Sequence, residues 1–124
     1  MRIGFVTTEE SATWPKVSRM IGRYDLILKE NIEVEAGKSL VIKTGLKFDV
    51  PAGKSLLILG DDNTQDNGLL LHPFVVVYGY VQEIFLNLSN ISNQHASMRK
   101  HDAYANIYVM DKEDIVHFEL KGRE

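Results

Sequence analysis

Apolar residues recur at every second position in several short segments of this chain. The pattern is clearest in Ile84–Leu88 and Val116–Leu120. Successive side chains of a strand point to opposite faces, so this alternation predicts strands with one buried face. Many short strands separated by turn residues are typical of an all-β sandwich or barrel. The expected strands are residues 25–29, 32–35, 39–44, 46–50, 55–59, 68–71, 74–78, 83–88, 103–110 and 115–120.

The N-terminal part of the chain lacks this alternation. Pro15 biases Trp14 toward extended geometry, which limits any helix there to one short turn. We expect residues 1–22 to form a short irregular arm and residues 23–120 to form the β domain. With 124 residues, 44% of them hydrophobic, the whole chain 1–124 fits a single domain with a modest core.

One segment of the sequence occurs twice. Val34–Ile42 (VEAGKSLVI) is echoed by Val50–Ile58 (VPAGKSLLI), and each copy predicts a strand, a tight turn at Ala-Gly-Lys and a second strand. The Gly-Lys-Ser triplets are not phosphate loops, because Ile32 and Phe48 stand where that motif needs its first glycine. We interpret the two copies as consecutive hairpin-like corners of one barrel.

Composition argues against several classes of function. A net charge of −3 provides no basic face for nucleic acid, and the absence of cysteine excludes disulfides and thiolate metal sites. The polar run Asp61–Gly68 lacks the spacing of a calcium loop and predicts a hairpin tip. No signal-peptide core and no apolar run of about 20 residues is present. We therefore expect no metal site, no membrane or nucleic-acid partner, and a protein that is not secreted but cytoplasmic, or part of a virion if a phage encodes it.

Five segments in order resemble the motifs of the trimeric dUTPase and dCTP deaminase superfamily, across residues 22–110. They are Gly22–Leu26 (GRYDL), Ile32–Gly37 (IEVEAG), Lys43–Leu46 (KTGL) with Val50-Pro51, Tyr80–Ile84 (YVQEI) and His101–Asn106 (HDAYAN). The resemblance implies a dUTPase-like distorted β-barrel, similar to a jelly roll, that assembles as a homotrimer with sites between its subunits.

The resemblance also implies candidate nucleotide-binding residues. Asp25 matches an aspartate that positions metal or phosphate groups, Gly68 matches a family glycine, and Tyr80 matches a tyrosine that stacks beneath the deoxyribose. Asp25 can equally be a carboxylate at a strand edge, and Tyr80 can equally be a packing residue with its hydroxyl at the surface.

The sequence departs from the family pattern where the chemistry occurs. In a gapless alignment the phosphate-binding P-R-S-G motif falls on Leu59–Asp62, so that Gly60 replaces the arginine. The position of the catalytic aspartate, which activates water in the family, is occupied by Val77, and valine cannot accept a proton. The glycine-rich C-terminal motif has no counterpart. The catalytic motifs are therefore absent, and no catalytic residue is expected.

These departures favour a non-catalytic homotrimer that serves as a structural or assembly module. A larger assembly, such as a phage capsid, is a further candidate partner of this trimer. Decoration of the virion is one role that such a trimer would have. Val75, Val76 and Val77 are the candidate trimer core, because apolar side chains on both faces of a strand suit burial. The alternatives are a protein that sequesters a nucleotide and a divergent dUTP pyrophosphatase. The latter would recruit Asp61, Asp62 or Glu83 and use Mg²⁺, whereas the non-catalytic protein needs no cofactor.

Overall fold

The computed structural model describes residues 4–7, 15–17 and 23–111, which form twelve strands and one short helix. The all-β fold expected from the alternation is confirmed, and no helix of the described residues is long and apolar enough to cross a membrane. The strands are β1 (Gly4–Thr7), β2 (Lys16–Val17), β3 (Arg23–Ile27), β4 (Ile32–Val34), β5 (Ser39–Lys43), β6 (Leu46–Asp49), β7 (Lys54–Gly60), β8 (Leu69–Leu71), β9 (Phe74–Val77), β10 (Phe85–Asn90), β11 (Ala96–Met98) and β12 (Ala103–Asp111). The helix, α1, spans Asp62–Asp66.

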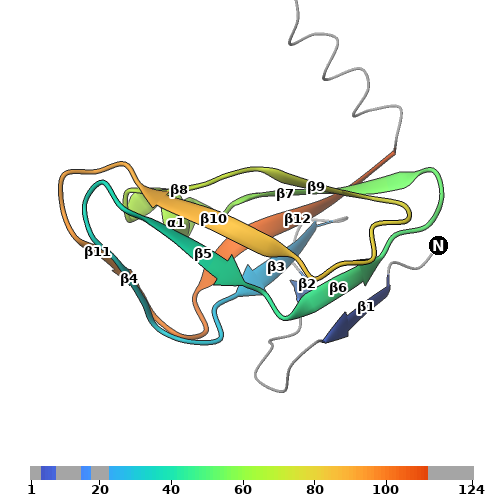
Figure 1. The fold of residues 1–124 in the computed structure, drawn as a ribbon, viewed down its shortest axis with the longest axis horizontal. Helices are drawn as coiled ribbons and strands as arrows, with labels where there is room; N and C mark the ends of the chain where they lie inside the picture. The colour runs from blue at the N-terminus through green and yellow to red at the C-terminus, as the bar shows by residue number, and fades with distance from the viewer. Residues whose placement is uncertain (1–3, 8–14, 18–22, 112–124) are drawn as a thin grey trace, which may run out of the picture.

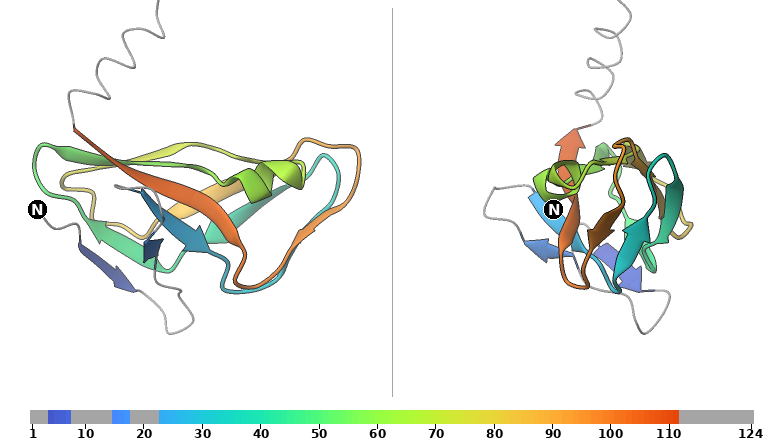
Figure 2. Two further views of the ribbon diagram at one scale, coloured as in Figure 1. Left: turned by 180° about the vertical axis from the view of Figure 1, so that it is seen from behind. Right: turned by 90° about the vertical axis from the view of Figure 1, so that its left-hand side faces the viewer.

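Two main antiparallel sheets enclose the interior (Figures 1 and 2). The larger sheet has the strand order β2-β3-β12-β7-β9, and the smaller has the order β5-β10-β8. Two ribbons, β1 with β6 and β4 with β11, complete the barrel-like arrangement. The long strand β12 lies at the centre of the larger sheet, where it pairs with β3 on one side and β7 on the other.

The core follows from the alternation of side chains along these strands. In β10, Leu86 and Leu88 are buried, whereas Phe85 and Asn87 are exposed. Ile58 on β7 and Ile107 on β12 oppose one another in the register and are both buried. Burial of one such aliphatic side chain contributes about 1.5–3 kcal/mol, so this single apolar interior is the main stabilising element of the fold.

The two echoed segments form corners of the barrel, each with a glycine of positive φ, Gly37 at 76° and Gly53 at 84°. A backbone hydrogen bond closes each turn, from Lys38 N to Glu35 O at 3.0 Å and from Lys54 N to Pro51 O at 3.1 Å. The strands on either side of a corner do not pair with each other, since β4 pairs with β11 and β5 with β10. The corners therefore carry the chain from one sheet to another and are not hairpins.

The polar run that was expected to be a hairpin tip contains helix α1 instead. The Asp61 side chain accepts a hydrogen bond from Asn63 N at 2.9 Å, which caps the first turn, and this capping explains why a polar segment becomes helical. Strands β1, β2 and β11 were not predicted, and β2 lies within the arm that was expected to be irregular. The strand expected at residues 115–120 lies outside the described residues.

Asn90, at the end of β10, ties three segments together. Its side-chain Nδ2 donates to Val34 O and to Gln94 O, both at 2.8 Å. Its Oδ1 accepts from Ser92 N at 3.0 Å and from Ser92 Oγ at 2.7 Å. The side chain is almost fully buried, so these bonds compensate the loss of its hydration.

Candidate functional site

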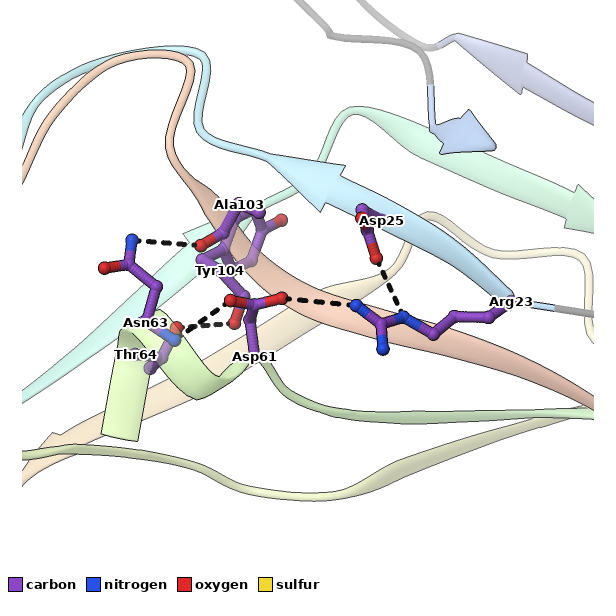
Figure 3. A network of polar contacts seen from close by, with 7 residues as sticks. All are labelled: Arg23, Asp25, Asp61, Asn63, Thr64, Ala103 and Tyr104. Atoms are coloured by element: carbon purple, nitrogen blue, oxygen red, sulfur yellow. Dashed lines mark hydrogen bonds and ion pairs between the residues drawn. The ribbon is translucent and has the colours of Figure 1, made fainter. Parts of the chain in front are cut away.

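Four polar side chains gather on the outer face of the larger sheet, and we call them the polar network: Arg23, Asp25, Asp61 and Asn106. The register explains the gathering, because Asn106 on β12 pairs with Asp25 on β3 and with Leu59 on β7. Arg23 and Asp61 lie two residues further along their segments from these partners and therefore share the same face. Figure 3 shows Arg23, Asp25 and Asp61 in this arrangement.

The four side chains bind one another. Arg23 Nε donates to Asp25 Oδ1 at 3.1 Å, and Arg23 Nη2 lies 3.8 Å from Asp61 Oδ1. The Asn106 amide, oriented with Nδ2 toward the carboxylates, donates to Oδ1 of both Asp25 and Asp61 at 2.8 Å. One guanidinium and one amide thus hold together two carboxylates that would otherwise repel each other.

Helix α1 fixes Asp61 within this network. While Asp61 Oδ1 faces Arg23 and Asn106, its Oδ2 caps the helix through Asn63 N. The buried Thr64 hydroxyl then donates to Tyr104 O at 2.7 Å, and Asp61 N donates to the same carbonyl at 3.1 Å (Figure 3). The position of Asp61 is therefore set by β12 as well as by its own helix.

The charge of the network is negative, with two carboxylates against one guanidinium. The hydrogen bond that Arg23 donates to the Asp25 carboxylate raises the pKa of Arg23, so this cation holds its proton more firmly than a free arginine. Another anion placed here would meet one cation that is already paired and two carboxylates that repel it. Within one chain, the network thus offers an anion one paired cation and two carboxylates.

The enzyme alternative requires side chains that can help to hold a magnesium ion. Oδ1 of Asp25 and Oδ1 of Asp61 already accept from Arg23 and Asn106. Among residues 4–7, 15–17 and 23–111, no three His, Cys, Asp or Glu side chains gather in a group that could hold a metal ion. Asp61, Asp62 and Glu83 therefore do not converge on a common site within one chain.

The three valines of β9 have different environments. Val76 is fully buried in the chain's own core and is therefore not available as a contact between subunits, which corrects the expectation for this residue. Val75 and Val77 point to the outer face and are 40% and 49% exposed. These two residues retain the apolar surface that the proposed trimer core requires.

Val77 lies far from the polar network within one chain. It pairs with Ser55 near the start of β7, whereas Asp61 follows the end of that strand. Six residues of extended chain separate Ser55 from Asp61, which is about 20 Å at 3.3 Å per residue. A single chain therefore does not bring together Val77 and Asp61, the positions that the resemblance aligns with water activation and with phosphate binding.

Gly68 and Tyr80, the other candidate binding residues, have packing roles. Gly68 follows α1 with φ of 77°, and a Cβ atom there would lie 2.9 Å from the Cβ of Ser92. Close approach and positive φ together explain the glycine. The Tyr80 ring is half-buried and packs edge-on against Phe74, with centroids 6.0 Å apart. Asp25 alone of the three candidates belongs to the polar network.

Sequence reasoning did not identify Arg23 and Asn106 as members of the site. A signal for Arg23 was present, since residues two apart on a strand share a face and Arg23 precedes Asp25 by two. Asn106 falls within the segment that resembles the fourth family motif. Its partnership with Asp25 depends on strand pairing across 81 residues, which composition and spacing do not reveal.

One family model and several solved structures are similar to this chain. The family model described as dUTPase matches residues 11–122. A mutant dUTPase from phage phi11 of S. aureus, in which a structural Mg(II) ion is coordinated, superposes with a TM-score of 0.79 at 15% identity, covering 90% of this chain and 91% of that one. Native EIAV dUTPase superposes with a TM-score of 0.76 at 20% identity, covering 89% of this chain and 88% of that one. A mutant Staphylococcus bacteriophage 80alpha dUTPase with dUpNHpp superposes with a TM-score of 0.78 at 14% identity, covering 89% of this chain and 82% of that one. Identities this low establish a shared fold.

Proposed function

We infer a function from one premise, which is that this chain belongs to the dUTPase family. It is a non-catalytic member of that family, and it works as a homotrimeric structural or assembly module. The fold is retained over nearly the whole chain, while the residues at the positions of phosphate binding and water activation cannot perform these tasks.

The polar network is the observation that carries this proposal. The aligned phosphate-binding arginine is replaced by Gly60, and the aligned serine is replaced by Asp61. Asp61 is engaged by Asn106 and by the helix terminus, and it faces Arg23. A triphosphate would have to displace Arg23 from Asp25 and overcome the repulsion of two carboxylates. We therefore expect the internal hydrogen bonds of the polar network to be more favourable than contacts of the same side chains with a nucleotide.

Exposed apolar residues support self-association. Val75, Val77, Tyr78, Val81 and Phe85 belong to β9, to the loop after it and to the start of β10, and all five are exposed. We call this set the β9 patch. Clusters of exposed large apolar side chains are typical of interaction surfaces, and Tyr78 and Val81 are more than 60% exposed in a single chain. A second and third copy are the occupants that the family resemblance implies.

A pair of measurements tests the proposal. Light scattering at micromolar concentration is expected to give about three times the chain mass of 14.1 kDa. A pyrophosphate-release assay with dUTP and Mg²⁺ is expected to show no rate above background. A stable monomer contradicts the assembly role, and turnover on the order of 1 s⁻¹ contradicts the loss of catalysis.

Titration calorimetry separates the alternatives. Binding of dUTP or dCTP without turnover would instead indicate a nucleotide-sequestering protein, and turnover would indicate a divergent pyrophosphatase. We expect neither. A place in a phage virion remains a prediction, and co-sedimentation of the trimer with capsids would test it.

A further inference from the structure

A β-bulge in the central strand redirects one tyrosine. In the pairing of β12 with β3, Ala103 lies opposite Ile27 and Ala105 lies opposite Leu26, so Tyr104 is the extra residue. Regular alternation would place Tyr104 on the outer face together with Asn106. Instead it is only 3% exposed and belongs to the hydrophobic core, because a bulge turns a side chain away from its regular direction.

Tyr104 lines a cavity of about 450 Å³ between the end of β3, the start of β4 and strand β5. A volume of this size is within the range of small-molecule sites. The lining combines aliphatic side chains with polar ones, and three of the aliphatic residues, Leu28, Ile32 and Ile42, are buried members of the core. The rim is polar and exposed, with Glu30, Asn31, Glu33 and Lys43.

The hydroxyl of Tyr104, a residue of the cavity lining, has no hydrogen bond to any described residue. The hydrogen bonds that involve this residue and its neighbours use its backbone carbonyl, which accepts from Thr64 Oγ1 and Asp61 N. Burial raises the pKa of the hydroxyl, so it stays protonated and able to donate. A buried donor gains most from an acceptor that a ligand would bring.

We propose that this cavity is a binding site for an uncharged organic molecule with an apolar body and a carbonyl or ring-nitrogen acceptor, held by a hydrogen bond from the Tyr104 hydroxyl. The aliphatic walls would cover the apolar body. Lys29 and Lys43 on the lining are balanced by Glu30 and Glu33, so the rim provides no net attraction for an anion. The cavity shares no lining residue with the polar network, and the inference does not depend on the proposed function.

Three probes of similar size test the chemistry of this site. They are benzamide, which is neutral and carries an acceptor, benzoate, which is its anionic counterpart, and toluene, which has no acceptor. Methyl NMR of the full chain reports binding through Leu28, Ile32, Leu40 and Ile42. We expect benzamide to shift these methyl signals, with an affinity about fivefold or more above that of benzoate and of toluene, as one net hydrogen bond predicts.

Tyr104→Phe isolates the hydroxyl, since it preserves the ring that fills the core. The variant should lose the preference for benzamide over toluene, with about a fivefold loss of benzamide affinity. Tyr108→Phe is the matched control, because Tyr108 lies on the same strand but lines no part of the cavity. Absence of methyl shifts in the wild type, a preference for benzoate, or an unchanged benzamide affinity in Tyr104→Phe would overturn the proposal. The wild-type comparison stands even if the variant is poorly folded.

Discussion

At the residue scale, the main feature of the candidate site is that its polar side chains bind one another. Asp25 was the one candidate nucleotide-binding residue that the polar network contains, and its neighbour Arg23 could have been inferred from their shared face. Asp61 and Asn106 could not, because they reach Asp25 only through the pairing of β3, β12 and β7. Side-chain partners across sheets depend on register, which short-range spacing does not encode.

Restoring the missing acid is not expected to restore activity. Val77→Asp should release no pyrophosphate from dUTP above background, because Gly60 and the closed polar network still leave phosphate without a binding cation. Val75→Asp is the matched control, since Val75 lies on the same strand with a similar exposure. Release of pyrophosphate by Val77→Asp but not by Val75→Asp would show that one residue alone separates this chain from an enzyme.

The buried hydroxyl of Tyr104 makes stability fall at high pH. Its pKa is raised by burial, so above the ordinary tyrosine pKa of about 10 the unfolded chain loses this proton while the folded chain retains it. The contribution of the protonated Tyr104 hydroxyl to the free energy of unfolding is fully present below pH about 10. It decreases as the pH rises from there toward the pKa of this hydroxyl in the folded chain. Relative to Tyr104→Phe, the wild type should lose about 1.4 kcal/mol per pH unit in that window. Denaturant unfolding at several pH values above 10 measures this difference, and parallel curves for the two proteins would contradict it.

At the scale of elements, the sequence predicted nine of the twelve described strands and missed β1, β2 and β11. Strand β11 has three residues and β2 has two, which is too few for a period to be visible without other signals. Helix α1 was missed although Asp61 is a good capping residue, because the five residues that follow it carry no apolar stripe. The cavity was also not predictable, since the bulge at Tyr104 breaks the alternation on which the prediction of buried faces depends.

The Asn90 side chain holds the end of β10, and its removal should be costly. Asn90→Ala leaves the carbonyls of Val34 and Gln94 without their side-chain donor in or near the core. We expect a loss of roughly 2–3 kcal/mol in the free energy of unfolding. Asn87→Ala on the exposed face of the same strand should change it by about 0.5 kcal/mol or less. Urea unfolding at equal protein concentration measures both variants, and equal losses would indicate that the Asn90 bonds add no stability.

At the scale of the whole molecule, the chain has the fold of the dUTPase family, and its polar network and Val77 lie apart within one chain. The polar network and Val77 lie at opposite ends of β7, and the five exposed apolar residues of the β9 patch belong to β9, the loop after it and the start of β10. Joining these features requires more than one copy of the chain. Assembly is therefore the property that the arrangement of the molecule supports best.

The β9 patch should decide the oligomeric state. The double variant Val75→Asp with Val77→Asp places two charges in the proposed interface and should reduce the mass in solution from about three chains to one, because burial of unpaired charge is costly. Val41→Asp is the matched control, since Val41 is exposed on the outer face of the smaller sheet. Light scattering measures both, and a double variant that keeps the wild-type mass would place the interface elsewhere.

The position of β12 also determines when the fold can form during synthesis. β12 is the last strand that the structure describes, yet it is the central strand of the larger sheet and separates β3 from β7. A ribosome must therefore produce β3 and β7 long before the strand that joins them exists. Loop closure over such separations is slow, so we expect the sheet to form in milliseconds to seconds once β12 is available, rather than progressively as each strand is synthesised. Until β12 is made, the edges of β3 and β7 that face it have no partner. The nascent chain then depends on chaperones or on rapid folding to avoid pairing with other chains.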